Sequence, residues 1–481
     1  MSDIVALAQG VVMAGVTGPN LDESLPEYGG YLLFPDERDS LHEIRVLTDL
    51  LRARTSGLAP VIAIDQEGGA VARLRDGVEA IPSMMAVGAA GDLELARCAG
   101  EQLGFDLRRA GCTLDCAPVL DLALEPKNTV IGTRSFGADP LRVAPLAAAF
   151  AAGLRASEVL PCFKHFPGHG STSVDSHAAL PIVDTDSATF RTRDLEPFAA
   201  VAADAPAMMS AHVVVRAFDA QRPATLSRAI LSDLLRAELG FAGALLTDCL
   251  EMNAVAASGS GASAVDALAA GADLLIFSHN DRLAAAAVTA ITIAVAEGRL
   301  PIERLADAHA RVMRLREAGA KPLPIDEFAP HEGIGREIAR CAVTLVRGLP
   351  HADPVASIAI SFGGSGEWLH HEAPALEELS ASIDPSPEEA ESLRNVVAQS
   401  RRRPLLLARR AHCHPAQASA IAQMLDRFPD ALVVSLLEPF DLPLFAQARH
   451  LLATCGDTAI SIAGLADVIF GGSMPSGRLP I

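Results

Sequence analysis

The densest group of chemically active side chains runs from Lys164 to His177, in the sequence KHFPGHGSTSVDSH. It holds one lysine, three histidines and one aspartate, directly after a short apolar run. Asp175 and His177 are two residues apart, so an extended chain points both side chains the same way. The carboxylate would then orient the imidazole and tune its basicity for general acid/base catalysis near neutral pH. The spacing therefore predicts an Asp-x-His pair carried on a loop rich in glycine and serine.

Two other interpretations of this stretch are open from the residues alone. His165, His169, Asp175 and His177 are all types that bind metals. A proline and a glycine between the first two interrupt the helix that would place them on one face, and no glutamate accompanies them, so we expect no metal. The other interpretation is a solvated loop with incidental histidines. We expect residues 167–174 to be weakly packed and mobile, because they include few large apolar side chains.

A second candidate is the aspartate that ends the apolar run GALLTD, residues 243–248. A helical stretch and a glycine turn come before this run, so it is predicted to be a buried strand with Asp248 at its end. A carboxylate in that place acts either as the N-cap of the next helix or as a nucleophile that forms a glycosyl ester. The residues alone leave both roles open.

The elements that must position these residues alternate regularly over the first 320 residues. Near-continuous apolar runs, separated by helical stretches, indicate a parallel sheet covered on both faces. Seven clear repeats and a doubtful eighth favour a (β/α)8 TIM-like barrel over an open sheet. The predicted strands are residues 29–34, 61–66, 112–122, 161–166, 207–215, 243–248 and 272–279.

Most of these strands end in a polar or charged residue. In barrel enzymes the active site is assembled at the C-terminal ends of the strands. One such residue is readily explained as a helix cap, but the repetition is not. The residues are Asp65, Asp121, Lys164, His165, His212, Asp248 and His279.

A smaller second domain is predicted to follow the barrel. Three prolines interrupt two helical stretches between residues 318 and 333. We place the catalytic barrel at residues 1–320, a linker at 321–333 and an α/β layered domain at 334–481. The candidate strands of this second domain are VASIAISF, RPLLLARRA, DALVVSLLEP and LADVIFGG.

The composition narrows the classes of partner. The 481 residues carry 39 Lys and Arg against 59 Asp and Glu, a formal net charge of −20. With no basic run, this excludes nucleic acid and anionic membranes as partners.

Eight scattered cysteines are typical of reduced thiols in a core. The first eighteen residues lack the positive start of a secretory signal and are predicted to be helical. No uncharged apolar run reaches the roughly 18 residues of a membrane span. We therefore expect a cytoplasmic protein. No cofactor is expected.

Four motifs, in this order, resemble the bacterial β-N-acetylglucosaminidases of glycoside hydrolase family 3. They are IDQEGG (64–69), IGTRSFG (131–137), KHFPGHG followed by DSH, and GFAGALLTD. The resemblance covers essentially the whole chain, including PSGRLPI at its end. It implies the barrel, a family-type second domain and a metal-independent glycosidase.

The resemblance also assigns roles to single residues. It implies that Asp248 is a nucleophile that forms a covalent glycosyl-aspartate intermediate. His177, supported by Asp175, would be the acid/base in place of the usual second carboxylate. Because this motif lies in the first domain, the second domain is not expected to supply a catalytic residue. The residues implied to hold the hydroxyls of a terminal N-acetylglucosamine are Asp65, Arg73, Arg134, Lys164 and His165, with His212 lining the same pocket.

Two positions depart from the family pattern. Ala70 stands where many relatives have arginine, and Cys249 replaces the second aspartate often found after the nucleophile. We expect the first change to affect only the rim of the pocket. The second should alter the field at the nucleophile without removing its function.

The sequence therefore predicts a retaining β-N-acetylglucosaminidase acting on small glycans, and the resemblance implies muropeptide fragments of the cell wall as substrates. A neutral histidine base tolerates an anionic acceptor, so a β-N-acetylglucosaminide phosphorylase with the same intermediate is the nearest alternative. A sugar-binding protein without turnover is an alternative from another class, although a binder needs no nucleophile. The oligomeric state is not predicted.

Overall fold

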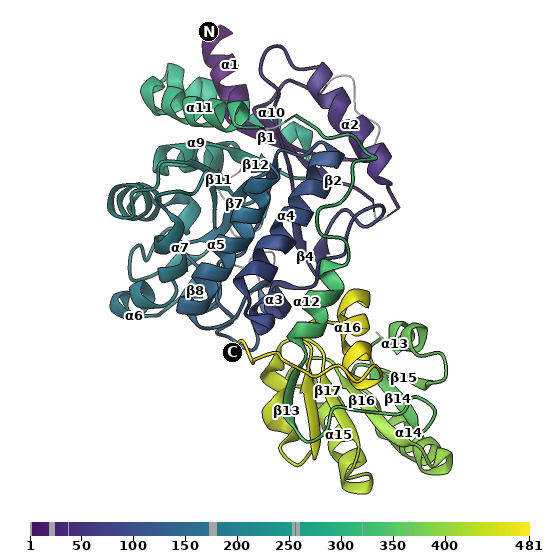
Figure 1. Cartoon of the computed structure of the whole chain (residues 1–481). Helices are drawn as coiled ribbons and strands as arrows, with labels where there is room; N and C mark the ends of the chain where they lie inside the picture. Colours follow the sequence, from purple (N-terminus) through teal and green to yellow (C-terminus); the bar gives the residue numbers. More distant parts are fainter. Residues whose placement is uncertain are drawn as a thin grey trace.

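A computed structural model describes residues 2–18, 25–36, 38–172, 180–252, 255, 260–319, 321–364 and 366–481 (Figure 1). Within these residues, a parallel eight-stranded sheet has the order β11-β9-β7-β6-β3-β2-β1-β12. Its strands are β1 Val12–Thr17, β2 Gly30–Phe34, β3 Val61–Ile64, β6 Leu114–Asp115, β7 Leu160–Phe166, β9 Ala207–Ser210, β11 Ala244–Thr247 and β12 Leu275–Phe277.

The two edges of this sheet meet at a narrow seam. An isolated parallel bridge joins Leu246 of β11 to Leu274, just before β12. At the same place Thr247 N donates to Leu274 O (3.0 Å) and Asp273 N donates to Leu245 O (2.8 Å). The ring of strands closes through these bonds, which confirms the predicted (β/α)8 barrel.

Alternate side chains of each barrel strand belong to different hydrophobic clusters. In β3, Val61 and Ala63 pack with the other residues of the barrel interior, whereas Ile62 and Ile64 pack between strands and helices. Both faces of the strand are therefore buried. This is why the strands appear in the sequence as unbroken apolar runs rather than as alternating ones.

Helices cover the outside of the barrel (Figure 1). Local capping sets their bounds. The α4 helix begins after Asp92, whose side chain accepts from the amides of Glu94 and Leu95, and it ends before Gly111, a C-cap with φ 84°. Among the described helices, none is both long and apolar enough to cross a bilayer. The helices are α1 Ser2–Gly10, α2 Leu41–Ala53, α3 Met84–Ala90, α4 Leu93–Ala110, α5 Pro140–Ala156, α6 Ser187–Thr192, α7 Glu196–Val201, α9 Ser260–Ala270, α10 Asp281–Ala296 and α11 Ile302–Glu317.

Shorter elements complete the first part of the chain. A π-helix, η3, takes the place of a regular helix between β9 and β11. Two small strand pairs lie outside the barrel sheet. The elements are η1 Gly132–Arg134, η2 Ala224–Leu226, η3 Ala229–Glu238, β4 Gln66–Gly68 with β5 Val71–Ala72, and β8 Ile182–Val183 with β10 Val214–Val215.

Three predicted elements of the barrel are corrected by the structure. The N-terminal stretch is a helix only as far as Gly10, and its second half is β1, paired with β2 and β12. This strand is the doubtful eighth repeat. The predicted strand 112–122 is reduced to β6, because Pro118 beyond it lacks the N–H that a ladder needs. The predicted strand 207–215 is split into β9 and β10.

The second part of the chain forms a mixed six-stranded sheet in the order β13-β18-β17-β16-β14-β15. One edge strand, β13, is antiparallel, and its neighbours are parallel. The strands are β13 Thr344–Arg347, β14 Ser357–Phe362, β15 Glu377–Ala381, β16 Arg403–Ala408, β17 Leu432–Ser435 and β18 His450–Ala453. The helical elements are α12 Ile334–Ala342, α13 Gly366–Glu372, α14 Pro387–Ser400, α15 Pro415–Arg427, η4 Pro439–Phe445 and α16 Ala459–Ile469.

Helices pack on both faces of this sheet. Ile358 and Ile360 of β14 pack with α14 and α15, whereas Ala359 packs with α13 and α16. Of the four predicted strands, the run LADVIFGG is instead the end of α16. The chain then returns to the barrel, where Ala138 N donates to Pro480 O (2.9 Å) (Figure 1).

Gly153→Ala tests the close approach of α4 and α5. A Cβ at Gly153 would lie 2.0 Å from Arg97 O, and one at Gly100 would lie 2.0 Å from Phe150 O. Helix propensity alone favours alanine by about 1 kcal/mol. We predict the opposite sign, a loss of about 2 kcal/mol in the free energy of unfolding, because the two backbones must separate. Chemical denaturation measures this, with the exposed Ala152→Gly as the propensity control. Unchanged stability of Gly153→Ala would contradict the prediction.

Candidate active site

Three strands of the barrel end in charged residues whose side chains lie on the inward-facing side of the strand. Asp65 follows β3, Lys164 lies near the end of β7, and Asp248 follows β11. Each lies two residues beyond an interior apolar residue of its own strand; these are Ala63, Cys162 and Leu246. The alternation of a β-strand therefore directs all three side chains to the mouth of the barrel.

A cavity of about 540 Å³ lies at this mouth, a volume in the range of small-molecule sites. Asp175 and His177 lie outside the described residues. His212 is not among the residues that line the cavity. The structure brings the other six predicted site residues together in its wall: Asp65, Arg73, Arg134, Lys164, His165 and Asp248.

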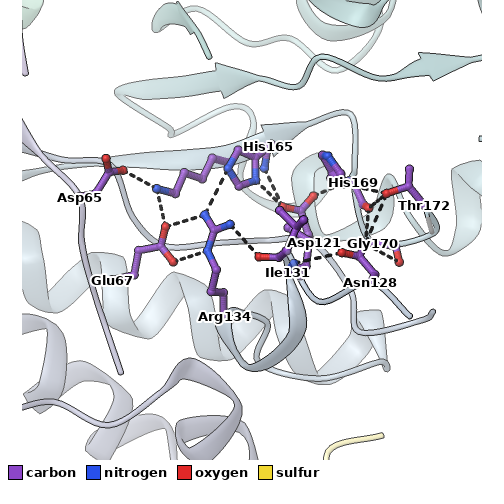
Figure 2. Close-up of polar contacts among 12 residues, drawn as sticks. Asp65, Glu67, Asp121, Asn128, Ile131, Arg134, His165, His169, Gly170 and Thr172 are labelled. Atoms are coloured by element: carbon purple, nitrogen blue, oxygen red, sulfur yellow. Dashed lines mark hydrogen bonds and ion pairs between the residues drawn. The ribbon is translucent and has the colours of Figure 1, made fainter. Parts of the chain in front are cut away.

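Glu67 joins a buried lysine and a half-buried arginine in the wall of the cavity (Figure 2). Its Oε1 lies 2.6 Å from Lys164 Nζ and 2.7 Å from Arg134 Nη2, and its Oε2 lies 2.8 Å from Arg134 Nε. Lys164 Nζ also lies 2.8 Å from Asp65 Oδ1. Because Glu67 is only 1% exposed and Lys164 only 2%, these four charged groups form a rigid array of donors and acceptors suited to hydroxyl groups.

The members of this array stabilise one another's charges. Burial acts to raise the pKa of Glu67, but Arg134 and Lys164 outweigh it and lower that pKa to about 2. Burial acts to lower the pKa of Lys164, yet Asp65 and Glu67 hold it above its usual value. Glu67 and Lys164 are therefore both charged at neutral pH.

Asp121 fixes the two histidines of the KHFPGHG motif. Its Oδ2 lies 2.6 Å from His165 Nδ1, and its Oδ1 accepts from His169 N (2.6 Å). Burial acts to raise the pKa of Asp121, but its contacts with His165 and His169 outweigh burial and keep that pKa below its usual value. A carboxylate only accepts, so His165 Nδ1 carries the proton. The other ring nitrogen, Nε2, lies 3.4 Å from Arg134 Nη2.

Asn128 and Thr172 hold His169 from the other side (Figure 2). Thr172 Oγ1 lies 2.9 Å from His169 Nδ1, and Asn128 Nδ2 donates to His169 O (2.9 Å). Burial lowers the pKa of His169, so its ring is neutral. His169 Nε2 has no hydrogen-bond partner among the described residues, and the ring lines the cavity. Within residues 167–172 the expected weak packing is wrong, because His169 and Thr172 are buried and bonded.

Asp248 lies half-buried in the cavity wall. Its Oδ1 accepts a hydrogen bond from Cys249 N (2.7 Å). Burial acts to raise the pKa of Asp248, but His212, His165, the Cys249 amide and Lys164 outweigh it and hold that pKa below its usual value. An ionised carboxylate at the end of a barrel strand is able to attack an electrophilic carbon in the cavity.

His212 lies behind Asp248 rather than in the cavity. It is fully buried, with Nδ1 2.8 Å from Thr225 Oγ1 and Nε2 2.9 Å from Cys249 O. A carbonyl oxygen only accepts, so Nε2 carries the proton. His212 thus holds the backbone beside Asp248.

Phe34, Arg73, His279 and Glu251 line another part of the cavity. The Arg73 guanidinium lies 5.6 Å from the Phe34 ring centroid, and the Phe34 and His279 rings are 5.1 Å apart. Glu251 Oε2 accepts from His279 N (2.9 Å), whereas its buried Oε1 has no partner in the described part of the chain. Glu251 thus carries, beside the cavity, a buried acceptor oxygen that no described donor satisfies.

The two departures noted in the sequence lie in different surroundings. Ala70 is exposed, in the turn between β4 and β5, and does not line the cavity. Cys249 does line it, and burial raises the pKa of its thiol. Its Sγ lies 3.6 Å from Glu251 Oε2. A neutral thiol therefore stands beside the carboxylate of Asp248.

Sequence reasoning assigned no role to Glu67, Asn128 or Glu251. For Glu67 a signal was present, because it stands two residues after Asp65 in IDQEGG and so shares one side of an extended chain. Asn128 offered no such signal. Its main partner, His169, is 41 residues further along the chain. Among the described residues, no group of three or more His, Cys, Asp or Glu side chains is arranged to hold a metal ion.

Comparisons of the sequence and of the fold with known proteins agree on one family. Residues 25–315 match the family described as "Glycosyl hydrolase family 3 N terminal domain". A β-hexosaminidase of Chromobacterium violaceum is 39% identical over 300 residues, which cover 59% of this chain and 83% of that protein. A β-hexosaminidase of Pseudomonas aeruginosa is 39% identical over 262 residues, covering 54% of this chain and 77% of that protein. The fold matches a glycoside hydrolase family 3 β-N-acetylglucosaminidase from Paenibacillus sp. str. FPU-7 over 98% of each chain, with a TM-score of 0.90 and 31% identity.

Glu67→Gln removes the charge that Lys164 and Arg134 share. We predict a loss of about 3 kcal/mol in the free energy of unfolding at pH 7. Since the folded-state pKa, about 2, is below the ordinary 4.5, this stabilisation is complete above pH 4.5 and is lost as the pH falls towards 2. Denaturant unfolding at several pH values should show the parent and variant converging, and a constant difference would contradict this. Glu297→Gln, at an exposed pair with Arg299, is the control and should change stability by no more than about 0.5 kcal/mol.

Proposed function

The chain belongs to glycosyl hydrolase family 3, and from this we propose that it is a retaining β-N-acetylglucosaminidase acting on the non-reducing end of small glycans. It is a glycoside hydrolase of the β-hexosaminidase type. The finer assignment is supported by the name of its structural neighbour, a family 3 β-N-acetylglucosaminidase.

One observation carries the proposal: an ionised carboxylate and a rigid hydroxyl-binding array share one cavity. Asp248 is the carboxylate, and its lowered pKa keeps it nucleophilic at neutral pH. The array is the Asp65, Glu67, Lys164 and Arg134 network, which offers both an acceptor and donors. A sugar bound by its hydroxyls would be held with its anomeric carbon within reach of one carboxylate.

The proposed reaction has two steps. Asp248 attacks the anomeric carbon, the glycosidic C–O bond breaks, and the leaving oxygen takes a proton from His177. A glycosyl ester of Asp248 remains. His177, now neutral, then takes a proton from water as the water oxygen attacks the anomeric carbon and releases Asp248 as a carboxylate. Two inversions give net retention. His177 and its proposed supporting residue Asp175 enter from the sequence alone.

Muropeptide fragments of the cell wall are the proposed natural substrates, supported by the resemblance to the bacterial enzymes. The identifying experiment incubates the protein with an aryl β-N-acetylglucosaminide and with a muropeptide disaccharide, each with and without phosphate. We expect free N-acetylglucosamine released first as the β-anomer. A sugar 1-phosphate formed only with phosphate would identify a phosphorylase instead. Binding without turnover would identify a sugar-binding protein.

Asp248→Ala is expected to lower turnover by at least about 10³-fold while the fold is kept, because the glycosyl ester cannot form. Glu251→Gln, a second carboxylate in the same cavity, is the matched control and should lose far less. A 2-fluoro or 5-fluoro sugar inactivator should label Asp248, as peptide sequencing by mass spectrometry would reveal. Label on Glu251 or Asp65, or no label because the substrate's own acetamide is the nucleophile, would refute the assignment.

His177→Ala is expected to slow natural disaccharides far more than activated aryl glycosides, because a good leaving group needs little protonation. Asp175→Asn should show a milder version of the same pattern, since it only orients and tunes the imidazole. The measurement is kcat/KM for both substrate types in both variants. Equal losses on the two types would mean that this motif binds sugar instead of transferring protons.

A further inference from the structure

The second domain has a topology that ordinarily leaves a ligand crevice. Its parallel strands β14 to β18 lie in the order 2-1-3-4-5 when numbered along the chain. Sheets of this order bind ligands beyond the carboxyl ends of the strands, where the order reverses. Here the reversal lies between β14 and β16. Arg409 spans it, with Nη1 donating to Gly363 O (3.0 Å) and Nε donating to Asp457 Oδ2 (2.7 Å). Arg409 and Asp457 thus form an ion pair at this switch point.

The same strand ends contact the barrel. Arg410, after β16, makes two bonds to Glu438, after β17: Nε to Oε2 (2.8 Å) and Nη2 to Oε1 (2.7 Å). Glu438 is only 3% exposed, and its Oε1 also accepts from Thr133 N of the barrel (3.2 Å). The buried, ion-paired carboxylate of Glu438 in the second domain therefore accepts a hydrogen bond from a backbone amide of turn η1.

Glu438 packs so closely against turn η1 that no side chain fits at Gly132. A Cβ on Gly132, whose φ is 42°, would lie 2.1 Å from Glu438 Oε1. A second contact holds the other end of the same loop, where His412 Nε2 lies 3.0 Å from Pro126 O. The ring is held in turn by Asp441, whose Oδ1 is 2.5 Å from His412 Nδ1. Loop 126–133 is thus fixed at two points by the second domain.

The inner side of this loop is part of the active site. Arg134 directly follows Thr133, and its guanidinium lies in the array described above. Its Nη1 donates to Val130 O of the same loop (3.0 Å). Val130 and Ile131 line the cavity. One short segment therefore has the second domain on its outer side and the cavity on its inner side.

We propose that Glu438 is a positioning residue for the reaction: from the second domain it fixes turn η1, and thereby the Arg134 side chain that holds the terminal sugar. This inference rests on the sugar-binding role proposed for Arg134. It gives the second domain a part in substrate binding without giving it a catalytic residue.

The test measures kcat and KM of the full chain on an aryl β-N-acetylglucosaminide. Glu438→Ala is expected to raise KM about tenfold and to change kcat by less than about threefold, since a displaced Arg134 weakens ground-state and transition-state binding alike. Glu438→Gln keeps an acceptor oxygen for Thr133 N and should stay within about twofold of the parent KM. Arg142→Met removes a different interdomain bond, to Leu479 O, and is the control that should keep the parent KM.

A double variant separates this role from a merely structural one. Adding Glu438→Ala to Arg134→Ala should raise KM no further, because the positioned side chain is already absent. The positioning role of Glu438 would be overturned if the two substitutions multiplied their effects on KM. It would also be overturned if folded Glu438→Ala kept the parent KM. In both cases the sugar-binding role of Arg134 would stand. A parental kcat/KM in Arg134→Ala would overturn the sugar-binding role itself, and the inference with it.

Glu438→Asp keeps the test decisive if the alanine variant does not fold. Removing the carboxylate leaves Arg410 without its counter-charge, whereas aspartate retains the charge and withdraws it from Thr133 N by one methylene. We expect folded Glu438→Asp to show a KM raised several-fold, with a thermal transition close to that of the parent. A parental KM in this folded variant would overturn the inference.

Discussion

One buried carboxylate, Glu67, allows two cations to lie side by side at the mouth of the barrel. Lys164 and Arg134 both contact its Oε1, at 2.6 and 2.7 Å. Removed from water and without that oxygen between them, two like charges at such separations would repel strongly. The rest of the site depends on this arrangement, because Asp65 bonds to the same ammonium and His165 contacts the same guanidinium. This wall of the cavity is therefore shaped by charge pairing more than by apolar packing.

Much of the barrel was predictable because its strands are buried on both faces and read as unbroken apolar runs. The site residues on strands followed from the same regularity: Asp65, Lys164 and Asp248 each continue the inward side of a strand. The errors have equally local causes. The α16 helix is apolar on nearly all sides, so its sequence shows little helical periodicity and resembles that of a buried strand.

Residues that act through distant contacts were beyond any local pattern. Asn128 matters because of a segment 41 residues away, and Glu438 because of an amide 305 residues away. Neither separation leaves a spacing signal in a single sequence. The same is true of His212, whose type and strand suggested a place in the pocket but whose ring turns towards Thr225 and the Cys249 carbonyl. Only the packed structure separates a residue in the cavity wall from one behind it.

The seam of the barrel has a consequence for how long the site survives. The strand before Asp248 is joined to β12 only at the Leu246–Leu274 bridge and its neighbouring backbone bonds, whereas β2 pairs with β3 along its length. Short ladders open by local fluctuation at a lower free energy than central ones. The β11–β12 seam, like the two-residue ladders of β6, is therefore expected to open before the longer ladders, and its opening would disturb the Asp248 carboxylate while most of the barrel is still paired. The setting of the Asp248 carboxylate is thus tied to a short hydrogen-bonded seam as well as to the bulk of the fold.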